Sequence, residues 1–267
     1  MGIIASKFAF PVPTNTGRLP NGSRMIKTLD GRHEIPIYIV ASAAMLKSRP
    51  TVVFSHGNGG CMAYSVPTLE RWSQLYNVNV LCYEYIGYPH TTACDSGEFS
   101  SLSDNVASPS EENCYMSIAT AHHYLTTILG VPESLQIYVG RSIGTGPTTH
   151  MVSQLCAAGK KPRQAILISP FYSATHIVSP FLAALYDMFP NHRFVRDITC
   201  QLNIIHGDRD GVVPADQSLS LASVCGRNAN VHRTVLRNAG HNNLFERRDF
   251  ECALDRAFKT TQGEMNV

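Results

Sequence analysis

The sequence contains no long apolar stretch, no internal repeat and no strong excess of one charge. A spanning helix needs roughly 18 or more consecutive apolar residues, and no run in these 267 residues approaches that length. The amino end also lacks the apolar core of a secretory signal peptide. A formal net charge of +2 argues against a nucleic-acid-binding surface. We therefore expect one globular domain with a large core, for which 44% hydrophobic residues is ordinary.

Paired cysteines are missing as well. The 8 cysteines are scattered along the chain without a C-x-x-C pair, and no histidine or cysteine spacing matches a metal site. In a chain of this length the pattern indicates reduced thiols in a cytoplasmic protein rather than a disulfide framework. We expect no metal and no other cofactor.

What the sequence does contain is a serine between two glycines, in the stretch Gly140-Arg141-Ser142-Ile143-Gly144. A predicted strand precedes this stretch and a predicted helix follows it. In such a strand–turn–helix the sharp turn exposes the serine, and a Cβ at either glycine would clash as the strand doubles back. A bare G-x-S-x-G arises by chance in about one chain in ten of this length. The surrounding pattern must therefore support Ser142 as a catalytic nucleophile.

The other members of a Ser-His-Asp triad follow in the order serine, acid, histidine. Asp208 and Asp210 both come directly after a predicted buried strand, and the spacing G-x-x-D-x-x-V favours Asp210 as the acid. His241 follows the next predicted strand and is the candidate general base. Each lies just past the carboxyl end of a strand, where open α/β sheets build their sites. His241 would take the serine proton and Asp210 would orient the imidazole.

A glycine-rich turn supplies the remaining part of the site. The predicted strand Thr51–Ser55 runs into the sequence H-G-N-G-G, which suits a second oxyanion donor. We expect the backbone N–H groups of Asn58 and Ile143 to form the oxyanion hole. His56, in the same turn, is expected to be structural, with its imidazole bonded to local backbone.

The predicted elements alternate between strands and helices, which is typical of an α/β fold with a mostly parallel central sheet flanked by helices. We predict an extended segment over residues 1–30 and a single domain over residues 31–267. The polar stretch Thr91–Ser110 is predicted as a long surface loop, with Ser108 and Glu111 as a capping box for the helix that follows. The predicted strands are Glu34–Val40, Thr51–Ser55, Asn79–Tyr85, Leu135–Val139, Ala165–Ser169, Leu202–His206 and Val231–Leu236, and the predicted helices are Tyr64–Tyr76, Glu111–Leu129, Ile143–Ala158, Pro214–Val224 and Asn243–Phe258.

About thirty residues separate the strand that ends at Ser169 from the one that begins at Leu202. This is too few for a separate cap domain, so we expect a minimal lid and an open site. Apolar side chains recur in the segment at helical spacing. They either form a short helix packed on the core, or some of them line an acyl groove or touch the bilayer. For the groove, the candidate substrate-binding residues are Phe171, Tyr172, Phe181 and Leu185.

The amino terminus carries a second signal. It begins M-G-I-I-A-S, which matches the pattern M-G-x-x-x-[ST] for N-myristoylation of Gly2. One myristoyl chain gives only marginal membrane binding. Lys7, Arg18, Arg24 and Lys27 would each add about 1 kcal/mol near an anionic surface. We expect peripheral association with the cytoplasmic face of a membrane.

These residues resemble the α/β-hydrolase superfamily over roughly residues 30–260, and in particular its protein-depalmitoylating branch, α/β-hydrolase-domain-containing protein seventeen. The strings that carry the resemblance are F-S-H-G-N from Phe54, Y-E-Y-I-G-Y from Tyr83, V-G-R-S-I-G-T-G-P from Val139, S-P from Ser169, H-G-D-R-D from His206 and G-H-N from Gly240. The resemblance implies a membrane-associated thioesterase that removes S-acyl chains from proteins, with Ser142, Asp210 and His241 as its triad.

The chain departs from that branch at three places. The branch usually has glutamine where Arg141 stands, aspartate where Glu84 stands, and an amino-terminal cysteine cluster, whereas the first cysteine here is Cys61. The Arg141 cation either favours acidic substrate flanks or pairs with a surface carboxylate. Myristoylation of Gly2 would take over the anchoring role of the missing cysteines.

We therefore predict a serine hydrolase that removes S-acyl groups, palmitoyl above all, from membrane-associated proteins. Its partners would be an S-acylated protein or acyl ester substrate and the cytoplasmic membrane face, with no nucleic acid. One alternative is a small-molecule or lipid carboxylesterase with the same triad. The other is a myristoylated scaffold that keeps the fold without the activity.

Overall fold

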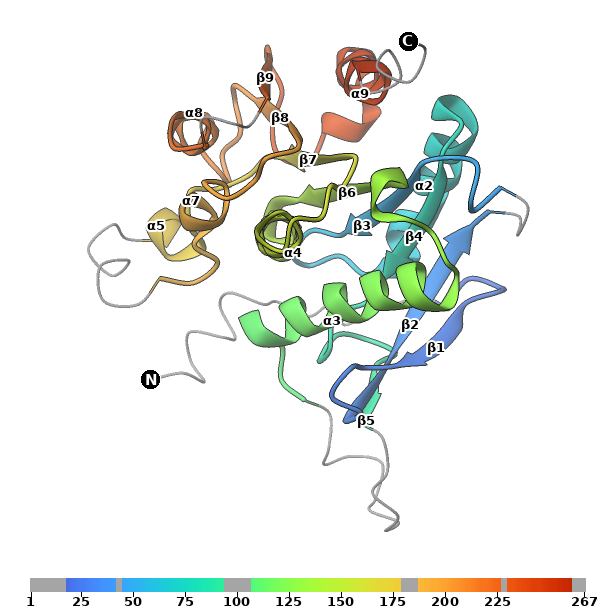
Figure 1. The fold of residues 1–267 in the computed structure, drawn as a ribbon. Coiled ribbons are helices and arrows are strands. Elements are labelled where there is room, and N and C mark those ends of the chain that lie inside the picture. Colours follow the sequence, from blue (N-terminus) through green and yellow to red (C-terminus); the bar gives the residue numbers. More distant parts are fainter. Residues whose placement is uncertain (1–17, 42–44, 94–106, 179–186, 227–229, 261–267) are drawn as a thin grey trace.

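The computed structural model describes residues 18–41, 45–93, 107–178, 187–226 and 230–260. Four residues singled out from the sequence, namely Gly2, Lys7, Phe181 and Leu185, lie outside these ranges, as does most of the predicted loop Thr91–Ser110. Strands and helices alternate along most of the described chain. The strands form one central sheet, and the helices lie around it (Figure 1).

The sheet is mostly parallel, as predicted. Its order is β1-β2-β4-β3-β6-β7-β8-β9, with β5 paired to β2. The neighbouring strands β4, β3, β6, β7, β8 and β9 run parallel to one another. Strand β2 is antiparallel to β4, and both β1 and β5 are antiparallel to β2. The strands are β1 (Arg24–Lys27), β2 (His33–Val40), β3 (Thr51–Ser55), β4 (Asn79–Tyr83), β5 (Thr92–Ala93), β6 (Gln136–Arg141), β7 (Gln164–Ile168), β8 (Gln201–Gly207) and β9 (Val231–Leu236).

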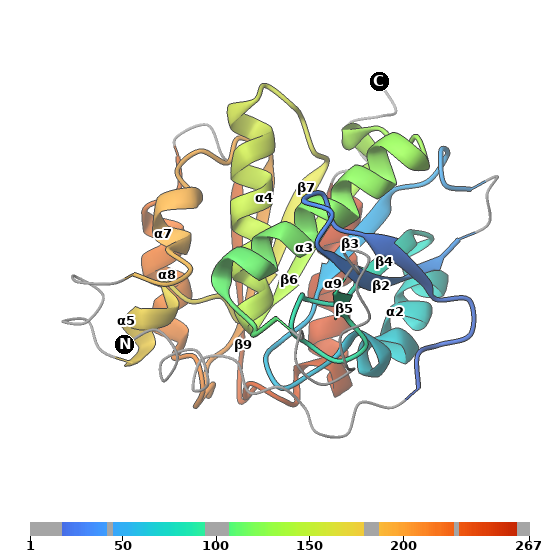
Figure 2. The ribbon, with the colours of Figure 1, turned by 90° about the horizontal axis from the view of Figure 1, so that it is seen from below.

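Helices cover both faces of this sheet, as Figure 2 shows from a second side. Successive residues of a strand point to opposite faces, so Val53 packs in one core and Val52 in the other. The first core contains α3 (Glu111–His123), α4 (Thr145–Ala157) and α8 (Ala215–Ser223), and the second contains α2 (Met62–Tyr76) and α9 (Arg248–Thr260). The short helices α5 (Ala174–Val178) and α7 (Asn191–Phe194) lie between β7 and β8 in the chain. Both faces of the sheet are therefore buried.

The start of α3 differs from the predicted capping box. Ser110 caps the helix, because its side chain accepts a hydrogen bond from the backbone N–H of Asn113 at 3.1 Å. Ser108 instead offers its backbone carbonyl to the Asn113 side chain at 2.9 Å. Since α3 begins at Glu111, the capping position is the residue directly before it. Beyond His123 the helix continues as a π-helical turn over Tyr124–Ile128.

The sheet begins earlier than the predicted domain start at residue 31. Residues expected in the extended segment 1–30 form the edge strand β1, in which Ile26 pairs with Ile35. Ile26 is only 9% exposed and joins the core, whereas Met25 is 40% exposed. A strand of four residues with one buried side chain shows no alternating pattern in the sequence, which is why the sequence analysis missed it.

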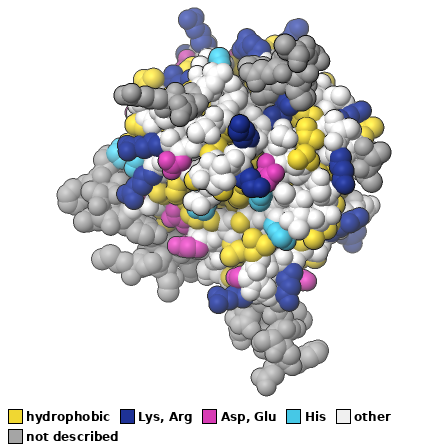
Figure 3. Space-filling model, in the orientation of Figure 1, with side chains coloured by type: hydrophobic (Ala, Val, Ile, Leu, Met, Phe, Trp, Pro, Cys, Tyr) yellow, Lys and Arg dark blue, Asp and Glu magenta, His cyan; other side chains and the backbone are white. Residues whose placement is uncertain are grey.

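Charged side chains are spread over the surface. Figure 3 shows Lys and Arg distributed across the face seen in Figure 1, with Asp and Glu between them. Among the described residues, no helix combines the length and the apolar character needed to cross a bilayer. The same part of the chain contains no group of three or more His, Cys, Asp or Glu side chains arranged to hold a metal ion.

The neighbouring residues Ile26 and Met25 test whether β1 belongs to the domain. Ile26→Ala should lower the free energy of unfolding by about 2 kcal/mol, because it removes a buried side chain. Met25→Ala, on the opposite face of the same strand, should change it by no more than about 0.5 kcal/mol. Urea unfolding monitored by circular dichroism measures both values. If Ile26→Ala lowered the free energy of unfolding no more than Met25→Ala, β1 would contribute nothing to the core.

Candidate active site

Ser142 lies where β6 passes into α4, at the start of a short 3₁₀ turn over Ser142–Gly144. Its φ angle is +52°, a left-handed conformation that residues other than glycine rarely adopt. A Cβ on Gly140 would overlap the carbonyl oxygen of Gly144, and a Cβ on Gly144 would overlap that of Ser55. The two glycines are needed because the strand and the helix approach too closely for a side chain, as the sequence predicted.

The structure brings the three predicted triad residues together. Nε2 of His241 lies 3.0 Å from Oγ of Ser142, and Nδ1 of His241 lies 2.7 Å from Oδ2 of Asp210. Ser142 is separated from His241 by 99 positions in the sequence, and Asp210 from His241 by 31. All three residues are at most 9% exposed. The arrangement has the nucleophile–base and base–orienter contacts that nucleophilic catalysis by serine requires.

Backbone contacts between two neighbouring loops set the distance from Asp210 to His241. The loops follow β8 and β9, which are adjacent and parallel, with Gly207 opposite Leu236. The N–H of Asp208 donates to the carbonyl of Leu236 at 3.0 Å, and the N–H of Arg209 donates to the carbonyl of Ala239 at 2.9 Å. A Cβ on Gly207 would overlap that Ala239 carbonyl. The acid loop therefore lies directly against the histidine loop.

Asp210, and not Asp208, occupies the position of the acid. Its Oδ1 accepts hydrogen bonds from the N–H groups of Val212 and Val213 at 2.9 and 2.8 Å, while Oδ2 faces His241. Burial alone would raise the pKa of Asp210, but hydrogen bonds from His206, His241 and the Val213 backbone lower it well below its usual range. Asp210 is therefore ionised at neutral pH, whereas Asp208 is exposed to solvent.

His206 also belongs to the site, and the sequence analysis assigned it no role. It is fully buried at the end of β8. Its Nε2 donates to the carbonyl of Val213 at 2.8 Å and lies 3.4 Å from Oδ2 of Asp210. His206 thus holds the loop that carries the acid. The available signal was a histidine four positions before the acid, near the end of a predicted buried strand.

The predicted oxyanion donors lie on neighbouring turns. Strands β3 and β6 are adjacent, with Ser55 opposite Gly140, so the turn after β3 reaches the start of α4. The N–H of Ile143 belongs to the first helical turn, where N–H groups have no acceptor within the helix. Asn58 is in the turn after β3, and its Oδ1 accepts from the Tyr88 hydroxyl at 3.0 Å. This bond holds the turn in place.

His56 is part of the same turn and has the structural contacts expected of it. Its Nδ1 lies 2.9 Å from the carbonyl oxygen of Gly57, and its Nε2 lies 2.6 Å from Oε1 of Glu84. Oε2 of Glu84 accepts from the N–H of Met62 at the start of α2. Both His56 and Glu84 are buried. This pair ties the turn after β3 to β4 and α2.

Arg141 contacts the histidine loop. Its Nη2 donates to the carbonyl of His241 at 3.3 Å and to Oδ1 of Asn242 at 3.0 Å. The guanidinium carbon lies 5.2 Å from the centre of the Phe245 ring. Among the described residues no carboxylate forms an ion pair with Arg141, so the structure does not support pairing with a surface carboxylate.

The predicted substrate groove is corrected at Phe171. This side chain is 2% exposed and packs in the core beside Phe189, so it lines no surface groove. Tyr172 is half-buried and stacks on the His192 ring, with 4.3 Å between ring centres. The other two candidates, Phe181 and Leu185, lie outside the described residues.

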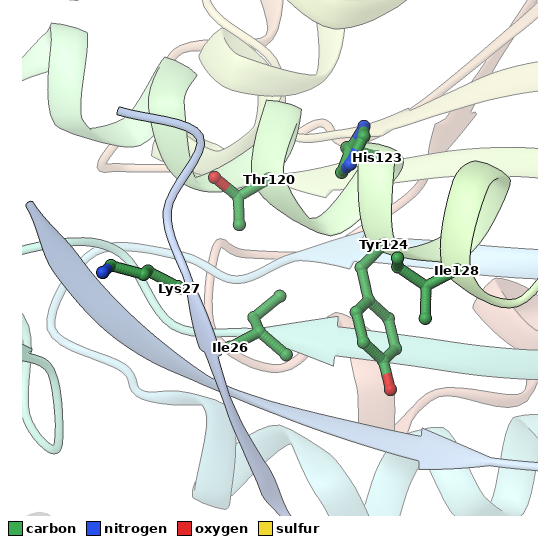
Figure 4. A pocket seen from close by; sticks show the side chains of 6 residues that line it. All are labelled: Ile26, Lys27, Thr120, His123, Tyr124 and Ile128. Atoms are coloured by element: carbon green, nitrogen blue, oxygen red, sulfur yellow. The ribbon is translucent and has the colours of Figure 1, made fainter. Parts of the chain in front are cut away.

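Two hollows lie on the described part of the chain, and no triad residue lines either of them. The larger, of about 340 Å³, lies between β1 and the end of α3 (Figure 4). The smaller, of about 130 Å³, is lined by Arg141 and by residues of the turn after β3. The larger hollow is lined by Ile26, Lys27, Thr120, His123, Tyr124 and Ile128.

Comparison with known proteins gives relatives for most of the chain, although no protein-family model matches it. Alpha/beta hydrolase domain-containing protein 17C of Xenopus tropicalis is 34% identical over 201 residues, which cover 74% of this chain and 57% of that protein. The human protein 17B is 32% identical over 197 residues, which cover 73% of this chain and 61% of that protein. The chain thus spans about 57% to 61% of the length of these two relatives.

Solved structures of esterases have the same fold. Est1E from Butyrivibrio proteoclasticus superposes with a TM-score of 0.67 at 15% identity and covers 91% of this chain and 100% of its own. An esterase from Pyrococcus furiosus superposes with a TM-score of 0.67 at 14% identity and covers 94% of this chain and 97% of its own. At this level of identity the likeness concerns the fold alone.

The contacts of Asp210 predict an acid-sensitive contribution to stability. Its pKa in the folded chain is below the value of about 3.9 in an unfolded chain. The ionised carboxylate therefore stabilises the fold above about pH 4, and this contribution decreases as the pH falls toward the folded-state pKa. Urea unfolding should show the stability difference between the wild type and Asp210→Asn shrinking from about pH 5 to about pH 3.

Asp208→Asn is the matched control for this titration. Asp208 is exposed and two positions away, so its variant should follow the wild type over the same pH range. A constant difference between the wild type and Asp210→Asn would contradict the assignment of the hydrogen bonds to an ionised carboxylate.

Proposed function

This chain belongs to the α/β-hydrolase superfamily, and on that basis we propose that it is a serine hydrolase of acyl esters or thioesters. Ser142 is the nucleophile, His241 the general base and Asp210 the orienting acid. The observation that carries the proposal is the hydrogen-bonded chain from Ser142 through His241 to Asp210, with distances of 3.0 and 2.7 Å. It stands at the carboxyl ends of parallel strands, on the fold shared with esterases.

The reaction follows from this geometry. His241 Nε2 accepts the hydroxyl proton as Ser142 Oγ attacks the acyl carbonyl carbon, and Asp210 stabilises the imidazolium that forms. The N–H groups of Ile143 and Asn58 hold the negative oxygen of the tetrahedral intermediate. Nε2 then gives its proton to the departing thiolate or alkoxide, which leaves an acyl-enzyme. A water molecule, deprotonated by His241, releases the acyl chain as a carboxylic acid and restores Ser142.

Within this class we propose that the substrates are S-acylated proteins at a membrane. The support is the resemblance to the domain-seventeen branch, which extends over 74% of the chain in the match to protein 17C. Between β7 and β8 the described part of the chain contains the short helices α5 and α7 and no separate cap domain. An S-acyl chain on a bulky protein needs a site without such a cap.

Hydrolysis of matched thioesters and oxyesters of increasing acyl length tests this proposal. The wild type should turn over long-chain thioesters fastest, and Ser142→Ala should abolish turnover on every substrate, since the nucleophile is gone. A preference for short oxyesters would move the assignment to a small-molecule or lipid carboxylesterase. Absence of turnover that depends on Ser142, together with no labelling by a fluorophosphonate probe, would indicate a non-catalytic scaffold.

The two aspartates of the acid loop provide the control in the same assay. Asp210→Asn should lower kcat by about 10⁴-fold, because the amide cannot hold the imidazole in the required tautomer. Asp208→Asn removes the same charge from an exposed position and should stay within about threefold of the wild type, as expected for a surface substitution.

We also propose that a myristoyl group on Gly2 brings the protein to the cytoplasmic face of a membrane. The support is the amino-terminal sequence M-G-I-I-A-S. In cell fractionation, Gly2→Ala should shift the protein from the membrane to the soluble fraction, because the acyl chain supplies most of the binding energy. Ser6→Thr keeps the pattern and should remain at the membrane. An unchanged distribution of Gly2→Ala would contradict the anchor.

A further inference from the structure

A small pocket lies beside the nucleophile, and the Arg141 guanidinium forms part of its wall. The pocket measures about 130 Å³ and is also lined by Gly57, Phe245 and the first turns of α2. A Cβ built on Gly57 would lie 3.3 Å from Nη1 of Arg141 and 3.7 Å from Cβ of Ser142. The Arg141 guanidinium and the Ser142 side chain therefore both lie next to Gly57.

Arg141 forms no ion pair with a carboxylate among the described residues. Its Nη2 is used by the carbonyl of His241 and the side chain of Asn242, and one face of the guanidinium lies over Phe245. These partners are neutral. Burial lowers the pKa of Arg141, and the negative charge of Asp210 offsets part of this effect without contacting the guanidinium.

Two buried carboxylates of the surrounding loops, Asp210 and Glu84, already have hydrogen-bond partners. Asp210 is sealed behind His241, and the exposed fraction of its side chain is 0%. Glu84 bonds to His56 and to the backbone of Met62, and the exposed fraction of its side chain is 1%. Neither carboxylate contacts Arg141 or lines the pocket. An anion that entered the pocket would therefore meet a cation before it met a like charge.

The first turns of α2 form another part of the wall. Tyr64, Ser65 and Thr68 line it with hydroxyl-bearing side chains, of which Ser65 donates to the carbonyl of Cys61 at 3.4 Å. The first turn of α2 contains no acidic residue, and its Met62 N–H already donates to Oε2 of the buried Glu84 at 2.8 Å. Hydroxyl groups and a guanidinium together form a set of donors that suits a carboxylate.

We propose that this pocket is an anion subsite in which Arg141 binds a carboxylate carried by the substrate next to the scissile acyl bond. The inference rests on the proposed function and narrows its substrate class to S-acylated cysteines that have an acidic neighbour. Arg141 is then a specificity-determining residue. Charge-assisted hydrogen bonds of this kind change binding about tenfold or more.

Two S-acylated peptides that differ only in Glu or Gln beside the acyl-cysteine provide the test. The wild type should show a ratio of kcat/KM for Glu over Gln of about ten. Arg141→Gln should bring the ratio close to one, and Arg141→Lys should keep part of it, because a point charge remains. Arg141 also bonds the His241 loop, so Arg141→Gln should slow both peptides. That common loss cancels in the ratio.

Arg209→Gln is the matched charge control, since it removes one positive charge from an exposed position in the acid loop. Its ratio should equal that of the wild type. A wild-type ratio near one, or an unchanged ratio in Arg141→Gln, would overturn the anion subsite.

A binding measurement separates this inference from the proposed function. Ser142→Ala is titrated with non-hydrolysable thioether versions of the two peptides. Tighter binding of the Glu peptide, lost on adding Arg141→Gln, supports the subsite even where the wild type turns over neither thioester. Equal binding of the two thioether peptides to Ser142→Ala would overturn the subsite, whatever the hydrolysis assay shows.

Discussion

The left-handed backbone at Ser142 is the constraint on which the rest of the site depends. A non-glycine residue at φ of +52° costs of order 1–3 kcal/mol and persists only where its surroundings demand it. Here the absence of side chains at Gly140 and Gly144 lets α4 pack against the ends of β6 and β3. The Thr145 hydroxyl donates to the carbonyl of Ser142 at 2.7 Å and helps to hold the turn. The strain thus places one hydroxyl at the carboxyl edge of the sheet.

Two loops flank that hydroxyl, and each is held by a buried imidazole–carboxylate pair. His56 and Glu84, 2.6 Å apart, fix the turn that carries Asn58. His206 lies 3.4 Å from Asp210 and holds the acid loop through the carbonyl of Val213. Loss of one partner would leave the other buried and unpaired, which costs more than the pair itself contributes. These two pairs therefore hold both loops in place.

Arg141 connects the nucleophile turn to the histidine loop. Because it directly precedes Ser142, its backbone is fixed by β6, while its side chain reaches the carbonyl of His241. The same side chain presents a charge to the pocket beside Gly57. The position of the His241 loop and the proposed selectivity for an acidic substrate therefore both depend on Arg141. A neutral side chain at this place could bond the loop, but it would leave the pocket without a cation.

The sequence by itself determined the α/β class, the order of most elements and the residues Ser142 and His241, and it favoured Asp210 over Asp208, because those signals are local. A glycine pair, a strand-length apolar run and a short spacing after a strand are each readable within a few residues. Only the tertiary structure decided that Asp210 rather than Asp208 meets His241, that Phe171 is a core residue, and that His206 supports the acid. It also decided that β1 joins the sheet through Ile26. Each of these depends on which strands lie side by side and on which side chain the packing leaves buried, and neither is encoded in the neighbouring residues alone.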